Sequence, residues 1–220
     1  MYIGEILSES HVDIKPNDSI GFALDKMNEF HCTQLAVVDN QDFLGLLSED
    51  DLLAAHDEDL PIRSLSVSFR FVYLYAYQHS YDALQYMSAH QLSVLPVLDK
   101  DNAFIGVLTL PELLNALNQT LGNQAAGAII VLEFGKHDVS FSHIAHLFES
   151  ENVRILNTAI REIPETTKVE MTIKVDKKNI ASLVASLWRF DYTVKATFND
   201  GSQDSDIQER YDILMNYLNL

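Results

Sequence analysis

The hydrophobic pattern of the first half of the chain occurs twice. Residues 35–39 (LAVVD) return at 95–99 (LPVLD), and residues 45–53 (GLLSEDDLL) return at 106–114 (GVLTLPELL), an offset of about 60 residues. A unit of this length that is used only twice is too long and too rare for a solenoid. The pattern therefore predicts two similar half-domains that pack on each other, with a candidate binding cleft between them.

Each repeat predicts the order strand, helix, strand, strand, helix. In the first repeat, Ser19 is a candidate helix N-cap. Ile20, Leu24, Met27 and Phe30 follow at the three- and four-residue spacing of an amphipathic helix. The remaining elements expected in this repeat are an extended stretch at 11–14, strands at 35–38 and 43–47, and a helix opened by Ser48.

The second repeat begins near residue 60 and predicts the same series of elements. Tyr81, Leu84 and Met87 mark its first helix. The other expected elements are strands near 71–75, at 94–98 and at 104–108, and a closing helix at about 110–118.

The pattern changes after the Gly-containing stretch 122–127. Apolar positions now predict a strand at 128–134, a helix over 141–148, strands at 153–161 and 168–175, a helix over 180–188 and a strand at 192–198. This β-α-β-β-α-β order is that of the ferredoxin-like split motif. Residues 199–204 read as a linker, and Ile207, Tyr211, Leu214 and Leu218 mark a last amphipathic helix.

Composition and charge narrow the class of protein. The chain is 47% hydrophobic, which suffices for a packed core, and its 15 basic and 32 acidic residues give a formal charge of −17. Such a surface repels phosphate backbones, so we expect no nucleic-acid binding. The start lacks a secretory signal, the most apolar window (125–134) is too short to cross a bilayer, and the single Cys32 fits a reducing compartment. We therefore expect a soluble, cytoplasmic protein without membrane contact.

The repeat also carries a polar motif, Gly-x-x-Ser/Thr-x-x-Asp/Glu. It stands as Gly45, Ser48 and Asp51 in the first repeat and as Gly106, Thr109 and Glu112 in the second. With the strands at 35–39 and 95–99, this motif resembles the cystathionine-β-synthase (CBS) domain, which occurs in tandem pairs. The resemblance implies CBS repeats at 1–59 and 60–121.

Residues 127–198 are similar to the ACT domain, a small-molecule regulatory module. The loop after its first expected strand keeps Asp138 but has bulkier residues where that family usually has a later Gly. The expected fold class is thus α+β (α/β), a tandem CBS pair plus a ferredoxin-like ACT-type domain, with residues 199–220 as linker and C-terminal helix. This architecture resembles bacterial acetoin-utilisation regulatory proteins.

The CBS resemblance implies a ligand. In that family the hydroxyl and the carboxylate of the motif face the cleft, and the acid binds the ribose of an adenine nucleotide. The implied ligand is AMP, ADP, ATP or an adenosine derivative, held as a regulatory ligand and not as a cofactor. The candidate ligand-binding residues are Ser48, Asp51, Thr109, Glu112, Lys15, Tyr75, Leu95 and Pro96.

These residues also allow simpler structural roles. Ser/Thr-x-x-Asp/Glu at a helix start is a capping box. Asp51 is the stronger ligand candidate of the two acids, because the extra methylene of Glu112 moves its carboxylate. Tyr75 or Tyr77 could stack on adenine or pack in the core. Four cations, Lys15, Arg63, Arg70 and Lys100, are candidate phosphate partners, and no pair of them must converge.

Catalytic and metal chemistry find little support in the sequence. There is no Gly-x-Ser-x-Gly elbow, glycine-rich phosphate loop or dinucleotide fingerprint. His143 and His146, near His137 and Asp138, have a possible metal spacing, but a solvated helix face explains them better. Cys32 precedes an apolar strand, where a packed thiol is expected. We expect neither an enzyme nor a metal site.

Two functions remain open. The first is a ligand-sensing regulator, in which adenine-ligand occupancy changes how the repeats pack and the ACT-like domain transmits the change to an unidentified partner. The alternative is a structural dimerisation or adaptor protein with degenerate ligand sites. Both readings expect a homodimer, since paired repeats and ACT-like sheets commonly associate in closed dimers.

Overall fold

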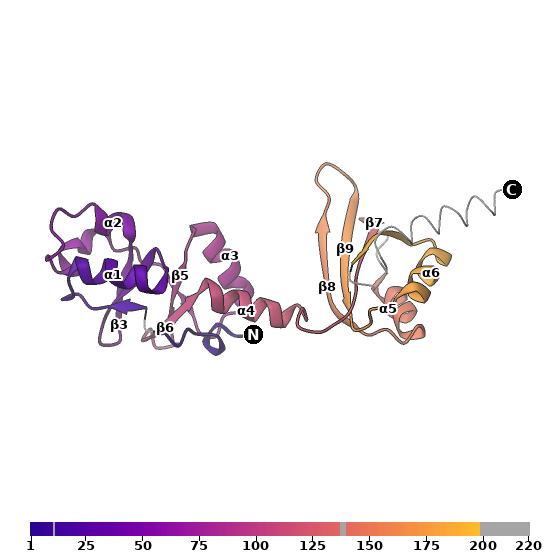
Figure 1. The fold of residues 1–220 in the computed structure, drawn as a ribbon, viewed down its shortest axis with the longest axis horizontal. Coiled ribbons are helices and arrows are strands. Elements are labelled where there is room, and N and C mark those ends of the chain that lie inside the picture. Colours follow the sequence, from indigo (N-terminus) through magenta and orange to yellow (C-terminus); the bar gives the residue numbers. More distant parts are fainter. Residues whose placement is uncertain (11, 137–139, 199–220) are drawn as a thin grey trace. The chain divides into compact units, whose positions relative to one another are not determined.

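A computed structural model describes residues 1–10, 12–136 and 140–198, which belong to two compact units (Figure 1). The first unit is Met1–Leu117, and the second begins at Asn118. The linker and helix expected within 199–220 lie outside the described residues. Among the described residues, no helix is both long enough and apolar enough to cross a membrane.

The two repeats of the first unit have the predicted order of elements. In the first repeat these are β1 (Asp13–Ile14), α1 (Ile20–Phe30), β2 (Gln34–Asp39), β3 (Asp42–Ser48) and the short α2 (Glu49–Leu53). In the second they are β4 (Leu74–Tyr75), α3 (Ser80–His90), β5 (Val94–Leu98), β6 (Phe104–Thr109) and α4 (Leu110–Thr120). Each repeat forms a three-stranded sheet, ordered β1-β2-β3 and β4-β5-β6.

Helix boundaries in the two repeats use corresponding residues. Ser19 caps α1, as predicted, by accepting a hydrogen bond from the backbone N–H of Phe22 at 3.1 Å. His79 occupies the same place before α3 and accepts from the N–H of Tyr81. Both helices end on a residue in the left-handed region, His31 and Gln91, with φ of 51° and 52°. These caps satisfy backbone groups that a helix end would leave unpaired.

The N-terminal segment of each repeat packs on the other repeat. The 3-10 helix Ile3–Glu5 is bound by the second repeat, because the N–H of Ile3 donates to the carbonyl of Gln78 at 2.9 Å. The 3-10 segment Ile62–Ser68 is bound by the first repeat, because the N–H of Ile62 donates to the carbonyl of Asp18 at 2.9 Å. Ile3 and Ile62 are both fully buried, so the exchange of segments joins the repeats in one hydrophobic core.

Strand β4 is shorter than the sequence predicts. The expected strand near 71–75 forms only at Leu74–Tyr75, where it pairs in parallel with β5. Before it, Arg70 makes an isolated antiparallel bridge to Leu46 on β3, so this stretch contacts the first repeat instead of extending the second sheet.

The second unit has the predicted β-α-β-β-α-β order. Its elements are β7 (Ile129–Gly135), α5 (Phe141–Ser150), β8 (Ile155–Glu162), β9 (Lys168–Val175), α6 (Ala181–Arg189) and β10 (Thr193–Phe198). They form one antiparallel sheet ordered β10-β7-β9-β8. Alternate residues of β7 and β9 pack with α5 and α6 in a second core. This arrangement confirms the ferredoxin-like α+β fold.

The other side of this sheet carries a charge network centred on Glu170. The Glu170 side chain is 4% exposed and accepts from Arg161 Nε at 2.6 Å and from Lys195. These cationic donors lower the pKa of Glu170. Neighbouring Glu133 pairs with Lys168, so the network joins strands β7, β8, β9 and β10.

Candidate functional site

A pocket of about 300 Å³ lies between the two repeats of the first unit. Four segments line it: residues 8, 10 and 12 near the N-terminus, the end of α1 with the two residues after it, the residue before β5, and the junction of β6 with α4. Its lining residues are Ser8, Ser10, Val12, Phe30, His31, Cys32, Ser93, Thr109, Leu110, Pro111 and Glu112.

Glu112 is held in the pocket wall by hydroxyl groups from both repeats. The Thr109 hydroxyl donates to Glu112 Oε2, and the Ser8 hydroxyl donates to Oε1 at 3.2 Å. Ser8 is itself fixed, because its N–H donates to the carbonyl of Val107 on β6 at 2.8 Å. A carboxylate has about four lone-pair sites, so these two bonds leave acceptor capacity for a ligand.

The rest of the lining is apolar or weakly polar. Val12, Phe30, Leu110 and Pro111 supply apolar surface, serine and threonine hydroxyls supply small polar groups, and His31 supplies an imidazole. None of the lining residues is a lysine or an arginine. The pocket therefore suits a ligand with an apolar face and hydroxyl donors better than a ligand with several negative charges.

Cys32 gives this pocket a buried thiol. Cys32 is only 8% exposed, and this burial is the largest cause of the raised pKa of its thiol. The nearby carboxylate of Glu49 raises the pKa further, while backbone hydrogen bonds and Lys26 lower it. The thiol is thus largely protonated at neutral pH, as expected for a packed cysteine.

Ser48 and Asp51 occupy the corresponding place in the first repeat, where they form the predicted capping box at the start of α2. The N–H of Ser48 donates to Asp51 Oδ2 at 3.1 Å, and the N–H of Asp51 donates to Ser48 Oγ at 3.3 Å. The Ser48 hydroxyl also donates to the same carboxylate oxygen. The capping role of this pair is confirmed, and its role in ligand contact stays a prediction.

The other four candidate residues lie away from the pocket beside Glu112. Leu95 and Pro96 are buried in β5, opposite Leu108 and Val107 of β6. Lys15 is exposed in the turn after β1. Tyr75 stacks on Tyr77 with ring centroids 5.2 Å apart, and this stack is part of a larger aromatic cluster on the first unit.

The candidate phosphate-binding cations are also dispersed. Arg63 Nη1 donates to Asn17 Oδ1 at 3.0 Å, and Arg70, Lys100 and Lys15 are exposed on separate segments. The structure therefore shows no pair of these cations at the pocket beside Glu112.

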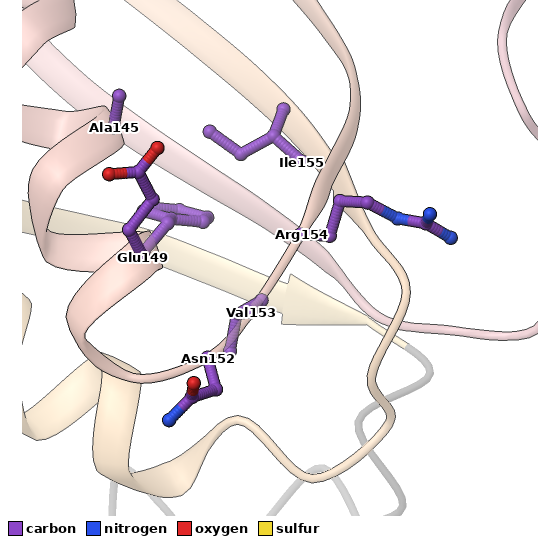
Figure 2. Close-up of a pocket in the computed structure, with 7 residues that line it drawn as sticks. Ala145, Glu149, Asn152, Val153, Arg154 and Ile155 are labelled. Carbon is purple, nitrogen blue, oxygen red and sulfur yellow. The ribbon is translucent and has the colours of Figure 1, made fainter.

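A second pocket, of about 490 Å³, lies in the C-terminal unit between α5 and the start of β8 (Figure 2). Figure 2 shows Glu149 on the helix side, and Arg154 on the strand side with its guanidinium pointing away from α5. Arg154 pairs with Asp176 at 3.5 Å. Asn152 and the apolar side chains of Ala145, Phe148, Val153 and Ile155 complete the lining.

Of the two described histidines of the C-terminal unit, His143 contacts aromatic residues and His146 is exposed. His143 Nδ1 lies 2.6 Å from the hydroxyl of Tyr192. His137 and Asp138 lie outside the described residues. Across the described part of the chain, no cluster of three or more His, Cys, Asp or Glu side chains could hold a metal ion.

Several pocket residues were not among the sequence candidates. Ser8, Ser10, Phe30 and Cys32 come from the first repeat, but they face the motif of the second one. The motif itself marked Thr109 and Glu112. Ser8 lies beside Thr109 and Glu112 because the N-terminal segment packs on the second repeat, and the sequence did not predict that exchange.

Comparison with known proteins assigns the first unit. The CBS-domain family model matches residues 3–58 and 63–119. An inosine-5'-monophosphate dehydrogenase from Methanocaldococcus jannaschii is 26% identical over 150 residues, which are 67% of this chain and 30% of that enzyme. The chain thus spans less than a third of the length of that relative.

Solved structures give further likenesses. A CBS domain pair/ACT domain protein from Thermotoga maritima is 23% identical, with a TM-score of 0.49 over 55% of this chain and 99% of its own. CBSX2, solved in complex with AMP, is 23% identical, with a TM-score of 0.46 over 54% of this chain and 96% of its own. From the two matched segments, which cover half of its residues, the chain belongs to the CBS-domain family.

Proposed function

We propose that the chain is a ligand-sensing regulatory protein that binds an adenosine derivative in the pocket beside Glu112. The observation that carries this proposal is the Glu112 carboxylate, held by hydroxyls of both repeats at the wall of a pocket with apolar surface. A carboxylate with free acceptor sites suits the vicinal hydroxyls of a ribose, and charged hydrogen bonds are the stronger kind. Apolar walls suit a nucleobase.

The charge around the pocket favours a ligand with few phosphates. Its lining contains Glu112 but no lysine or arginine. The first unit holds 18 acidic and 5 basic residues, so its field opposes a polyphosphate. We therefore expect adenosine, AMP or the cationic S-adenosylmethionine to bind more tightly than ADP or ATP.

Regulation follows from where the pocket lies. Because a ligand there contacts segments from both repeats, its binding favours one packing of the repeats over others. The C-terminal ferredoxin-like unit would pass this change to a protein partner or take a second effector in its own pocket. We propose a regulator and not an enzyme, acting as a homodimer, which sedimentation at several protein concentrations would test.

A thermal-shift screen with adenosine, AMP, ADP, ATP and S-adenosylmethionine tests the proposal. A ligand at 100 times its Kd should stabilise the protein by about 2.7 kcal/mol. Glu112→Gln removes the charge while keeping the size, and we expect it to abolish the shift. Asp51→Asn is the matched control, because it makes the same change in the other repeat.

The outcome decides between the two sites and the two functions. If Asp51→Asn abolishes the shift and Glu112→Gln does not, the ligand binds the first repeat's motif, as its carboxylate length suggested. If no adenine compound shifts the transition, the adaptor function replaces the sensor. That alternative is favoured by one observation, the closed capping box in which Ser48 and Asp51 bind each other.

A further inference from the structure

The first unit carries a ladder of aromatic rings that the proposed pocket does not use. Phe71, Tyr73, Tyr75 and Tyr77 alternate along the stretch before α3, and successive ring centroids lie 5.7, 5.5 and 5.2 Å apart. The ladder continues to Phe43, whose ring centroid is 5.4 Å from that of Phe71, and ends at Phe104, whose ring centroid is 6.4 Å from that of Phe43. We define these six residues as the aromatic ladder.

The ladder is anchored on one side and open on the other. Phe43 is buried, and Tyr73, Tyr75 and Phe104 pack partly against the core. Phe71 and Tyr77 are 67% and 61% exposed. An apolar surface that combines rigid support with exposed rings is typical of an interaction site.

Acidic turns lie at the ladder. The N–H of Phe104 donates to the carbonyl of Gln41 at 2.8 Å, and the Tyr75 hydroxyl donates to Asn102 Oδ1 at 2.9 Å. These bonds tie the turns 39–42 and 99–103 to the ladder. The two turns contain Asp39, Asp42, Asp99 and Asp101 against a single cation, Lys100.

Aromatic faces and carboxylates together select a cationic partner. A guanidinium stacks on a ring within about 6 Å of its centroid and binds carboxylates in a bidentate manner. A polyanion such as nucleic acid is repelled, and a second copy of this chain would bring the same negative charge. The electrostatics therefore favour a partner rich in arginine.

The ring spacing indicates how such a partner lies. Alternate residues of an extended chain are about 6.6 Å apart, roughly 1 Å more than the 5.2–5.7 Å between successive rings of the ladder, so two or three such residues in a row can each reach a ring. We propose that the aromatic ladder binds an extended segment of a partner protein with arginine at every second position. This interaction surface is separate from the pocket beside Glu112.

The test uses the full chain and a synthetic peptide, Arg-Ser-Arg-Ser-Arg-Ser-Arg, with labelled-peptide anisotropy at 0.15 M salt. We expect the double variant Phe71→Ala/Tyr77→Ala to weaken binding at least tenfold. Phe22→Ala, which removes another exposed ring on α1, should change binding less than twofold. All three proteins carry the same charge, so the difference reports the rings and not the acidic surface.

Two further measurements keep the result decisive. A peptide with the same residues but its four arginines adjacent should bind more weakly, because successive side chains of an extended chain point to opposite sides and only half of its arginines can face the rings. Asp42→Asn/Asp101→Asn should reduce both the affinity and its salt dependence. The proposal is overturned if the wild-type chain does not bind the peptide, or if the ring and control variants bind equally. It is also overturned if Phe71→Ala/Tyr77→Ala lowers only self-association in sedimentation, since the ladder would then join two copies.

Discussion

The two CBS repeats use one backbone design with different side chains. In each, a bulge on the third strand interrupts its pairing with the second strand, at the residue before a glycine with positive φ: Leu44 before Gly45 (φ 152°) and Ile105 before Gly106 (φ 149°). His31 and Gln91 end the first helices in the same left-handed conformation. The positions at which the backbone departs from regular structure are therefore the ones that the repeats share.

The polar contacts at the repeat boundary differ. Gln34 is buried in the first repeat, whereas its counterpart in the second is Val94. Cys32 corresponds to Leu92. Asp51 is bound within its own capping box, but Glu112 also receives a hydroxyl from the other repeat. The comparison teaches that the scaffold is symmetric while the candidate chemistry is not.

The largest expected effect concerns the two shared glycines. A Cβ at Gly45 would lie 2.7 Å from the Cβ of Phe69, whereas a Cβ at Gly106 would lie 3.5 Å from Leu7 Cδ1. Both substitutions by alanine strain the backbone, at about 1–3 kcal/mol, and only Gly45→Ala adds overpacking, at a further 1–3 kcal/mol or so. In urea unfolding followed by circular dichroism, Gly45→Ala should lose more stability than Gly106→Ala. Equal losses would show that the Phe69 contact relaxes freely.

The next effect concerns the buried amide that only the first repeat has. Gln34 Oε1 accepts from the N–H of Ser93 at 2.8 Å and from its hydroxyl at 2.6 Å. Gln34→Val copies the residue of the second repeat but removes the acceptor from these donors, which should cost about 1–3 kcal/mol. Gln85→Ala, on the exposed side of α3, should be neutral in the same unfolding experiment. A stable Gln34→Val would mean that the repeats tolerate a symmetric boundary.

A smaller effect should distinguish the two hydroxyls of the motif. Ser48 accepts from the backbone of α2, so Ser48→Ala should destabilise the protein by about 1 kcal/mol through the lost N-cap. Thr109→Ala should cost less stability, because the Ser8 hydroxyl still binds Glu112. The same unfolding measurement compares them. A larger loss for Thr109→Ala would indicate that its bond to Glu112 anchors the repeat boundary.

Patterns of apolar and polar residues in the sequence predicted much of this fold. The doubled pattern placed both repeats, the spacing from Ser48 to Asp51 predicted the capping box, and apolar alternation predicted the ferredoxin-like unit, because each of these depends on neighbours in the chain. The repeats also predicted a cleft between them and marked Thr109 and Glu112 in its wall, but the contact of Ser8 with Glu112 could not be predicted. Ser8 and Glu112 meet only because the first segment of the chain crosses to the second repeat, and such a contact leaves no periodic signal.

Segment 71–75 also departs from its local sequence preference because of contacts with the other repeat. Its β-forming aromatic residues predicted a strand, but only Leu74–Tyr75 joins the sheet. The rings of Phe71 and Tyr73 instead contact Phe43 of the first repeat at 5.4 and 6.1 Å. Packing between the repeats therefore overrode the local preference for a strand.

The smallest expected effect is kinetic and uses the single cysteine of the chain. Cys32 lines the pocket beside Glu112, and its counterpart Leu92 has no thiol, so alkylation reports on one of the two sites alone. Burial raises the pKa of this thiol, so at neutral pH the fraction present as reactive thiolate is smaller than in a free cysteine. This fraction increases as the pH rises through the raised pKa.

Iodoacetamide labelling, followed by mass spectrometry, should therefore be slow at pH 7, faster at pH 9, and slower again with a saturating ligand in the pocket. Glu112→Gln should remove the protection by ligand without changing the rate of the free protein. Protection that survives Glu112→Gln but is lost in Asp51→Asn would mean that occupancy of the first motif closes the second pocket. The two repeats would then be coupled through their shared core and not independent, because a ligand at one motif would change access to the other.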